Sequence, residues 1–375
     1  MMVMQWDIRE DPFDVMYEPL AGANTTTLLR LLAQNRFRIA GRYLPRLLYA
    51  GLISTILAPF RLLDTARYGR TVGNTEITRQ PLFIIGHWRS GTTYLHNLFS
   101  IDEQFGYCST FHSLVPGAFL GNQRLKSIVA ASIPETRPMD EVPMGADLPQ
   151  EEEYALGSLT PYAYYNGWIF PRNMRYYNRT VCLEDAPSRM REKWRQTYRW
   201  FLKKLTCHWD GRRLVLKNPA NTARLPLLLD MFPGARFVHI RRNPYDVYAS
   251  MMKFMTTVLP RYTVQRPPLQ EQMSDAILDV YEKLYRNYFT NRSKIPDGQL
   301  VEVGYEDFVQ EPLQHLERIY TSLSLDGYDT CRERFAAYIT SQSHITAHHY
   351  PLGDRLKERV ARRWEFAFDR LGYQP

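Results

Sequence analysis

PLFIIGHWRSGTTYLHNLF, residues 81–99, is the most informative stretch of this 375-residue sequence. It opens with an uninterrupted apolar run, which is typical of a strand buried on both faces of a parallel sheet. A loop over residues 86–93 follows, and a helix is predicted over residues 92–100. A buried strand, a glycine-containing loop and a helix in this order predict a phosphate cradle, in which backbone N–H groups and the helix N-terminus bind the anion.

The loop lacks the cation that a nucleoside triphosphate requires. Gly86 and Gly91 have the G-x-x-x-x-G spacing of a phosphate loop, but Thr92 and Thr93 stand where an NTPase carries Lys and then Ser or Thr. That lysine neutralises the β- and γ-phosphates, and here Arg89 is the nearby cation. The loop is therefore predicted to bind one 5′-phosphate through N–H groups, hydroxyls and a guanidinium.

Strand and helix patterns alternate along the rest of the chain, which indicates an α/β fold. We expect an open parallel sheet of the P-loop nucleotide-binding type, flanked by helices, over residues 76–375. A mostly helical insertion, or cap, is expected at about 105–205, and residues 1–75 are expected to be a helical N-terminal extension. The further predicted strands are residues 213–217, 235–241 and 300–305, and the further predicted helices are residues 222–231, 246–254, 273–288 and 312–323.

A second anion-binding element is predicted in FVHIRRNPYDVYASMM, residues 237–252. The strand ends at Arg242, an Asn-Pro turn follows, and Asp246 is expected to cap the next helix. Because that helix runs back past the strand end, Arg242 and Ser250 are placed to converge on one phosphate. Taken alone, R-N-P-x-D is a common strand–turn–helix junction.

Together the two elements resemble the sulfotransferase family that uses 3′-phosphoadenosine 5′-phosphosulfate (PAPS). The resemblance rests on R-S-G-T-T after the first strand and R-N-P-x-D-V-x-x-S after a later one, and it extends over roughly residues 80–325. It implies transfer of a sulfuryl group from PAPS to an acceptor hydroxyl. It also implies a set of donor-binding residues: Arg89, Ser90, Gly91, Thr92 and Thr93 at the 5′ end, Arg242 and Ser250 at the 3′ end, and Tyr305 of VGYEDFVQEP near the adenine.

Lys217, the last residue of RLVLK, is the candidate for contact with the leaving group. It ends a predicted strand at the sheet edge where ligands bind in open α/β folds, and it resembles the family's strand-end lysine. Arg89 would add positive charge at the same centre. Cytosolic members acting on phenols and steroids carry Lys-Thr-His here, with the histidine as base. This chain has Lys217-Asn218-Pro219, so another residue must accept the proton.

The acidic run LPQEEEYALGSL, residues 148–159, offers the leading candidates for that base. On a helix, Leu148, Ala155, Leu156 and Leu159 form an apolar face, with Glu152 near its centre, Glu151 at its edge and Glu153 elsewhere. Burial would raise the pKa of an inward carboxylate toward useful values. The run also resembles the Pro-Gln-Glu-acid-Glu motif of a bacterial-type subfamily. Alternatively, the acids merely oppose the helix dipole. His112 is the other candidate base, although a lone histidine is more often structural.

Composition favours an anionic ligand and gives no sign of a metal. The net charge is +8, but no nucleic-acid recognition motif is present. The four cysteines are scattered without metal-ligand spacing, which indicates reduced thiols. The first residues carry acids where a signal peptide has a basic stretch. These features predict a cytoplasmic protein, and they leave its oligomeric state open.

Residues 28–70 combine eight arginines and a single acid, Asp64, with many leucines. The longest uncharged stretch, residues 47–60, is shorter than the ~20 apolar residues that span a bilayer. Such a segment is expected either to lie at a membrane surface or to pack on the domain with its arginines in water. Aromatic clusters at residues 161–170 and at Tyr176 and Tyr177 predict a pocket for a lipophilic hydroxylated small molecule.

Two other functions fit parts of the pattern. A nucleotide-dependent kinase could use the same loop, although the missing lysine and the absence of a clear magnesium carboxylate oppose it. A non-catalytic nucleotide-binding scaffold at a membrane would retain both phosphate elements and would not need Lys217 or Glu152.

Overall fold

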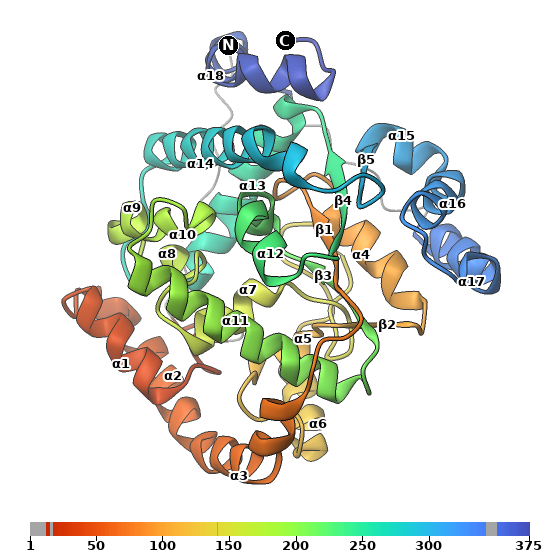
Figure 1. Ribbon diagram of the computed structural model, residues 1–375. Coiled ribbons are helices and arrows are strands. Elements are labelled where there is room, and N and C mark those ends of the chain that lie inside the picture. The colour runs from red at the N-terminus through yellow and green to blue at the C-terminus, as the bar shows by residue number, and fades with distance from the viewer. Residues whose placement is uncertain (1–12, 16–17, 141, 343–350) are drawn as a thin grey trace.

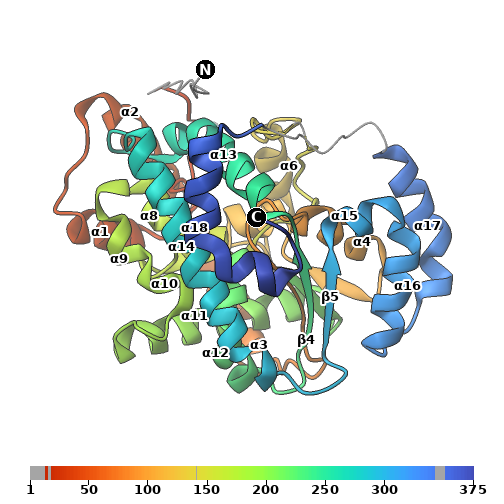
Figure 2. The same ribbon diagram turned by 90° about the horizontal axis from the view of Figure 1, so that it is seen from above.

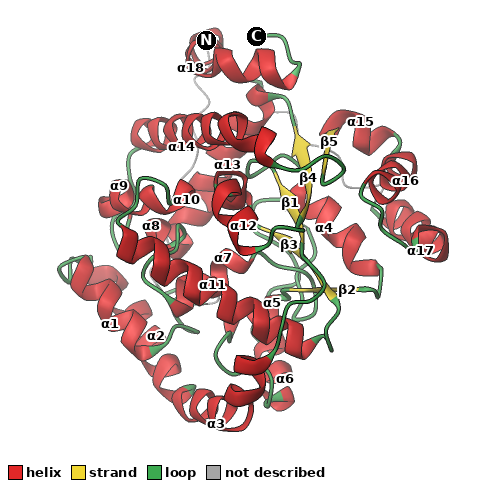
Figure 3. Ribbon diagram, viewed as in Figure 1, coloured by secondary structure: helices red, strands yellow, loops and turns green. Residues whose placement is uncertain are grey.

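The strands form one five-stranded, entirely parallel sheet, as the sequence predicts (Figures 1 and 3). The structure is a computed structural model that describes residues 13–375 apart from 16–17, 141 and 343–350. The strand order is β2-β3-β1-β4-β5. Four strands were predicted, whereas three-residue β2 at the sheet edge was not, since it has no apolar run. Their bounds are β1 Leu82–Ile85, β2 Phe105–Tyr107, β3 Arg213–Lys217, β4 Arg236–Arg241 and β5 Leu300–Gly304.

Helices cover both faces of the sheet and build most of the remaining described chain. The N-terminal region holds α1 Thr25–Gln34, η1 Gly41–Tyr43, α2 Leu44–Ile56 and α3 Ala58–Asn74. Between β1 and β3 lie α4 Thr92–Ile101, α5 Thr110–Leu114, α6 Gln123–Ala131, α7 Glu152–Leu159, α8 Asn166–Ile169, η2 Pro171–Asn173, α9 Met174–Tyr177, α10 Arg179–Cys182 and α11 Ser188–His208. After β3 come η3 Pro219–Ala223, α12 Leu225–Met231, α13 Pro244–Tyr262, α14 Gln270–Asn291, η4 Arg292–Lys294, α15 Tyr305–Gln310, α16 Pro312–Ser322, α17 Tyr328–Ser341 and α18 Asp354–Leu371.

Alternate residues of β1 feed two different cores. Leu82 and Ile84 pack with α4, α16 and α17, whereas Phe83 and Ile85 pack with the layer that contains α11 to α14. All four side chains are fully buried. A strand with both faces covered must be apolar at every position, which explains its continuous hydrophobic run. Figure 2 shows α16 and α17 on one side of the strands and α11 to α14 on the other.

β1 lies at the centre of the sheet, between β3 and β4. Ile84 pairs with Lys217 of β3, and Ile85 pairs with His239 of β4. Because all three strands are parallel, the segments that follow them leave from the same edge. The loop after β1, the end of β3 and the turn after β4 are thereby brought together.

Several helix boundaries differ from the prediction, and α13 in particular continues to Tyr262, eight residues past its predicted end at 254. The helix expected over residues 222–231 is divided into η3 and α12, which starts after Arg224 with a proline in its first turn. Asp246 does not cap α13, because Asn243 is the N-cap and its Oδ1 accepts from Tyr245 N at 2.9 Å. The turn residue therefore does the capping, and Asp246 lies within the first helical turn.

The N-terminal helices correct one expectation from the sequence. The continuous helical run Gly41–Asn74 is long and apolar enough to cross a membrane by length and composition, although no such segment was expected. Uncharged length alone was too strict a criterion, since a spanning window tolerates one or two charges. Only 22% of that window is buried in the protein. Its placement therefore depends on how the two helices attach to the rest of the molecule.

Candidate functional site

The loop after β1 adopts backbone conformations that its sequence makes accessible. Gly86 and Gly91 have φ values of 144° and 97°, and Arg89 has a φ of 70°. A Cβ at Gly86 would lie 2.3 Å from the carbonyl oxygen of Ile240, and one at Gly91 would lie 2.3 Å from the ring of Tyr305. Glycine is therefore required at both positions, because the loop backbone packs directly on β4 and on the residue that follows β5.

The two predicted phosphate elements are in direct contact. Arg242 Nη1 donates to the carbonyl oxygen of Arg89 at 3.1 Å, and Arg89 Nε donates to Ser250 Oγ at 2.9 Å. The guanidinium of Arg242 lies 4.6 Å from the ring centroid of Tyr305. Residues from the ends of β1, β4 and β5 thus form one cationic cluster.

The hydroxyl-bearing residues of the loop lie in two different environments. Ser90 is buried, and its hydroxyl donates to the carbonyl oxygen of His87 at 2.7 Å, which closes the loop on itself. Thr92 and Thr93 open the helix α4 and line a cavity. The cavity therefore borders the loop at the N-terminus of α4, where backbone N–H groups are available to an anion.

That cavity joins the phosphate loop to an aromatic and apolar wall. Arg89, Thr92 and Thr93 border it on one side, and Glu151 borders it on another. The wall is completed by Trp88, Arg137, Pro138, Met139, Met144, Gln150, Tyr154, Tyr165, Phe254, Val258 and Tyr262. Most of the side chains that line the cavity are thus aromatic or apolar, and the charged ones include Arg89 of the loop and Glu151.

Glu151 and Lys217 form a short ion pair at the cavity. Lys217 Nζ lies 2.5 Å from Glu151 Oε1, and their side chains are 2% and 12% exposed. The hydroxyl of Tyr165 donates to the other carboxylate oxygen of Glu151, and Trp88 Nε1 donates to Tyr165 at 2.7 Å. Burial lowers the pKa of Lys217, and the Glu151 carboxylate counteracts that effect. Glu151 therefore lines the cavity with the ammonium group of Lys217 held against its carboxylate.

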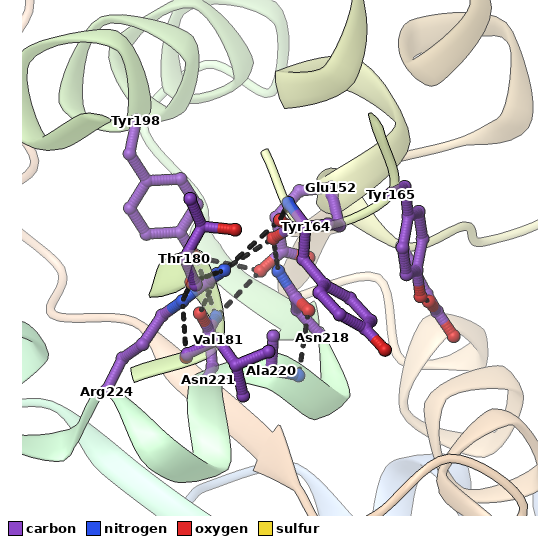
Figure 4. A network of polar contacts seen from close by, with 12 residues as sticks. Glu152, Tyr164, Tyr165, Thr180, Val181, Tyr198, Asn218, Ala220, Asn221 and Arg224 are labelled. Carbon is purple, nitrogen blue, oxygen red and sulfur yellow. Dashed lines mark hydrogen bonds and ion pairs between the residues drawn. The ribbon is translucent and has the colours of Figure 1, made fainter. Parts of the chain in front are cut away.

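Glu153 belongs to a separate, fully buried network. Arg224 donates to both of its carboxylate oxygens, with distances of 2.7 Å and 3.1 Å, and the amide of Asn218 donates at 2.7 Å. The backbone N–H of Tyr164 completes the set, while Arg224 also donates to the carbonyl oxygen of Thr180 (Figure 4). Arg224 lowers the pKa of Glu153 against the opposing effect of burial. The network anchors the start of α7 to the segment that follows Lys217.

Glu152, the expected centre of the acidic run, does not reach the cavity. Helix α7 begins at Glu152, so Leu148 lies outside it and the predicted apolar face does not form. Glu152 is fully buried, and its Oε1 accepts from Tyr198 at 2.7 Å and from Asn221 at 3.1 Å (Figure 4). Its Oε2 has no hydrogen-bond partner among the described residues. Burial raises the pKa of Glu152 to about 7.

His112, the other candidate base, is also separated from the cavity. It caps its own helix α5, where its Nδ1 accepts from Ser109 N at 3.1 Å. Its ring packs against Phe119 and His208 in a different, smaller pocket. Burial holds the pKa of His112 well below its ordinary value. Its position is that of a structural residue.

The aromatic prediction is partly corrected. Tyr165 lines the cavity, and Trp168 stacks behind it with ring centroids 4.0 Å apart. Tyr177 instead packs into the N-terminal cluster, where its hydroxyl accepts from Asn35 at 2.9 Å, and Tyr176 packs beside it. The aromatic clusters of the sequence therefore include one ring that lines the cavity, Tyr165, together with rings that belong to the core.

Sequence reasoning missed two parts of the cavity wall. Phe254, Val258 and Tyr262 lie on one face of α13, and their spacing of four residues was an available signal. Arg137 and Asp140 come from the insertion, and no pattern near them indicates proximity to the loop. Asp140 Oδ2 lies 2.8 Å from Arg89 Nη1 and 2.8 Å from Arg137 Nη2.

The parallel sheet and the contacts between the loop after β1 and the turn after β4 define an α/β protein of P-loop-like fold. The sequence model of the sulfotransferase family matches residues 81–330, and the chain belongs to this family. The predicted family is thereby confirmed.

Relatives of known structure or name agree with this placement. The chain is 29% identical over 357 residues to the omega-hydroxy-beta-dihydromenaquinone-9 sulfotransferase Stf3 of Mycobacterium bovis, covering 94% of this chain and 90% of that protein, and the protein of that name from Mycobacterium tuberculosis matches equally. The sulfotransferases STF1 of M. tuberculosis and STF9 of Mycobacterium avium share the fold, with TM-scores of 0.64 and 0.65 and identities of 19% and 15%. Each superposition covers 94% of this chain, and 94% and 97% of the other chains.

The buried carboxyl of Glu152 gives a testable pH dependence of stability. Its native pKa of about 7 lies above the ordinary value of 4.5, so the native state binds the proton more tightly than the unfolded state does. Stability should therefore fall as pH rises from about 4.5 to about 7. We expect Glu152→Gln to be more stable than wild type at pH 8 by about 1–3 kcal/mol in urea unfolding, with little difference at pH 5.

Glu153→Gln is the matched control for this measurement. It leaves the charge of Arg224 buried without its carboxylate, which should cost about 3–5 kcal/mol. That loss should be present at pH 5 and at pH 8. A gain for Glu152→Gln that is equal at both pH values would contradict the ionisation argument.

Proposed function

We propose that the chain transfers a sulfuryl group from PAPS to the hydroxyl of a lipophilic small molecule. Family membership supports the reaction, and the joined anion elements support the bisphosphorylated donor. The relative of M. bovis is named for a menaquinone-derived alcohol, which supports a lipophilic acceptor. The observation that carries the proposal is that Glu151, paired with Lys217, lines the same cavity as Arg89, Thr92 and Thr93.

The cationic cluster fits the two ends of the donor. Nε of Arg242 is buried and has no hydrogen-bond partner within the described chain, so it is available to a phosphate oxygen. Ser250 and Arg242 would hold the 3′-phosphate, and the loop with Arg89, Ser90, Gly91, Thr92 and Thr93 would hold the 5′-phosphosulfate. Tyr305, which covers Arg242, would pack near the adenine. The bound donor supplies the sulfuryl group.

Glu151 is proposed as the proton acceptor, in place of Glu152. Its carboxylate borders the cavity, where an acceptor hydroxyl can reach it, and Tyr165 and Lys217 hold it in position. Lys217 supplies the positive charge that stabilises the leaving phosphate oxygen, and Arg89 adds a second charge. The acceptor oxygen forms a bond to sulfur, the bond from sulfur to the phosphate oxygen breaks, and the hydroxyl proton passes to Glu151.

The cavity wall suits an acceptor with an apolar body. Phe254 and Val258 of α13 face it together with Met139 and Met144. Such side chains bind apolar groups by excluding water rather than through directed hydrogen bonds. The acceptor hydroxyl would then be the group that reaches Glu151.

The substitution Glu151→Gln tests the proposed base. The amide cannot accept the hydroxyl proton, so we expect turnover to fall by roughly 10²–10⁴-fold. The measurement uses ³⁵S-labelled PAPS with a panel of long-chain and polyprenoid alcohols. The dissociation constant for 3′,5′-bisphosphoadenosine, measured by calorimetry, should stay close to that of wild type.

Glu152→Gln provides the matched control, since it makes the same change one residue further along without touching the cavity. It should retain activity. Loss of activity in Glu152→Gln with full activity in Glu151→Gln would reverse the assignment. Tight binding of ATP with Mg²⁺, without binding of 3′,5′-bisphosphoadenosine, would replace the proposed function with a kinase-type activity.

The ion pair between Asp140 and Arg89 leads to a second prediction, which concerns donor binding. Its carboxylate occupies the Arg89 guanidinium, with 2.8 Å between Oδ2 and Nη1, and any donor anion that binds Arg89 must compete with it. We expect Asp140→Asn to lower the dissociation constant for 3′,5′-bisphosphoadenosine about tenfold, equivalent to 1.4 kcal/mol. Calorimetric titration measures this directly.

Asp147→Asn is the control, because that exposed carboxylate pairs with Lys126 and does not border the cavity. It should leave nucleotide affinity unchanged. Weaker binding in Asp140→Asn alone would mean that the carboxylate orients Arg89 for the nucleotide rather than competing with it.

A further inference from the structure

The N-terminal helices carry an unusual concentration of exposed apolar side chains. Eight of the fourteen exposed large hydrophobic residues in the described chain lie between residues 29 and 63. Four of them recur at every fourth position of α2, and two more lie on α3. The row consists of Leu44, Leu48, Leu52, Ile56, Leu62 and Leu63, with exposures from 48% to 71%.

The same region is cationic and shows no exposed carboxylate of its own. Six of its arginines are exposed, and the one acid between residues 25 and 74, Asp64, is buried in an ion pair with Lys204. Nζ of Lys204 lies 2.7 Å from Asp64 Oδ1. Leucines flanked by arginines match the apolar interior and anionic headgroups of a lipid surface. The exposed arginines are Arg30, Arg36, Arg38, Arg42, Arg67 and Arg70.

Buried polar contacts fix the opposite face of these helices to the protein. Arg46 and Glu18 form an ion pair at 3.0 Å with both side chains fully buried. Ser54 Oγ donates to the carbonyl oxygen of Ala23 at 2.7 Å. On a helix, Arg46, Ala50 and Ser54 lie opposite Leu44, Leu48 and Leu52, since 100° separates successive residues. One face is therefore anchored and the other is open.

This anchoring opposes a membrane-crossing arrangement of the helical run Gly41–Asn74. To cross a bilayer, the run would have to leave both Glu18 and Lys204, and each broken buried pair would leave an uncompensated charge. Lying flat requires no such change. Figures 1 and 2 both show α1 and α2 at an outer edge of the molecule, where a flat surface can approach them.

The anchored face also contacts a helix that lines the cavity. The guanidinium of Arg46 donates to the carbonyl oxygens of Pro260, at 3.2 Å, and of Arg261 at the end of α13. Phe254, Val258 and Tyr262 of that same helix line the cavity. The helix that bears the apolar row thus contacts the helix that forms the cavity wall.

We propose that the exposed face of α2 and α3 docks in the plane of an anionic bilayer, with the helices lying along the surface. Leu44, Leu48, Leu52 and Ile56 enter the acyl boundary, and the arginines contact the headgroups. This brings the α13 side of the cavity close to the membrane, where a lipophilic acceptor is concentrated. The link to the acceptor rests on the proposed function, whereas the docking itself does not.

Vesicle sedimentation tests the docking. The full chain is mixed with vesicles of phosphatidylcholine, with or without 30% phosphatidylglycerol as a probe of anionic lipid (about one charge per three headgroups). We expect strong binding to the anionic vesicles and weak binding to the neutral ones. The double variant Leu48→Gln/Leu52→Gln should reduce the partition coefficient at least tenfold, because the loss of even one buried leucine costs about that factor.

Leu269→Gln is the matched control, because Leu269 is 71% exposed but lies before α14, outside the docking face. It should bind as wild type does. Equal binding by wild type and the double variant would overturn the proposal. Wild-type protein that stays in the membrane during alkaline carbonate extraction would also overturn it, because that result indicates a spanning helix. A dimer in solution that becomes monomeric in the double variant would overturn it as well, because that result indicates an interface between two copies of the chain.

Activity on a short-chain soluble alcohol separates this inference from the proposed function. The double variant should retain that activity and its melting temperature while losing vesicle binding. Vesicle binding without any sulfuryl transfer by wild type would leave the docking surface standing and remove the proposed function. Sulfuryl transfer by wild type without vesicle binding would support the proposed function and remove the docking surface.

Discussion

Parallel pairing of β3, β1 and β4 is the constraint on which the site depends. Since these strands are neighbours and run in one direction, Lys217, the phosphate loop and Arg242 emerge at one edge of the sheet. The tight packing of Gly86 against β4 then brings the loop into contact with the second anion element. One backbone arrangement thereby places Lys217, Arg89 and Arg242 at the same edge of the sheet, where Arg89 lines the cavity.

Three consecutive glutamates in the insertion experience three different environments. Glu151 meets Lys217 at the cavity, Glu152 is held by hydroxyl and amide donors in the interior, and Glu153 is neutralised by Arg224. Burying adjacent carboxylates is costly unless each has its own partner. The partners come from β3, α11 and the segment after β3, so the run binds the insertion to the sheet while presenting one carboxylate at the cavity.

In the N-terminal helices, too, each buried charged group has its own partner. Their charged groups on the inner side are paired and buried, whereas the outer side keeps leucines and arginines. Arg46 connects that region to α13, which forms part of the cavity wall. Contacts within the described chain therefore connect the helix with the exposed apolar row to a helix that lines the cavity.

The sequence by itself determined the parallel α/β sheet, the loop after β1 and the proximity of Arg89 to Arg242. These follow from local features, because a doubly buried strand must be apolar and a tight loop must contain glycine. Tertiary structure decided which glutamate faces the cavity, that His112 lies elsewhere, and that Arg137 and α13 complete the wall. Those facts depend on where α7 begins and on contacts between residues far apart in the chain, such as Glu153 with Arg224, and no local pattern encodes such contacts.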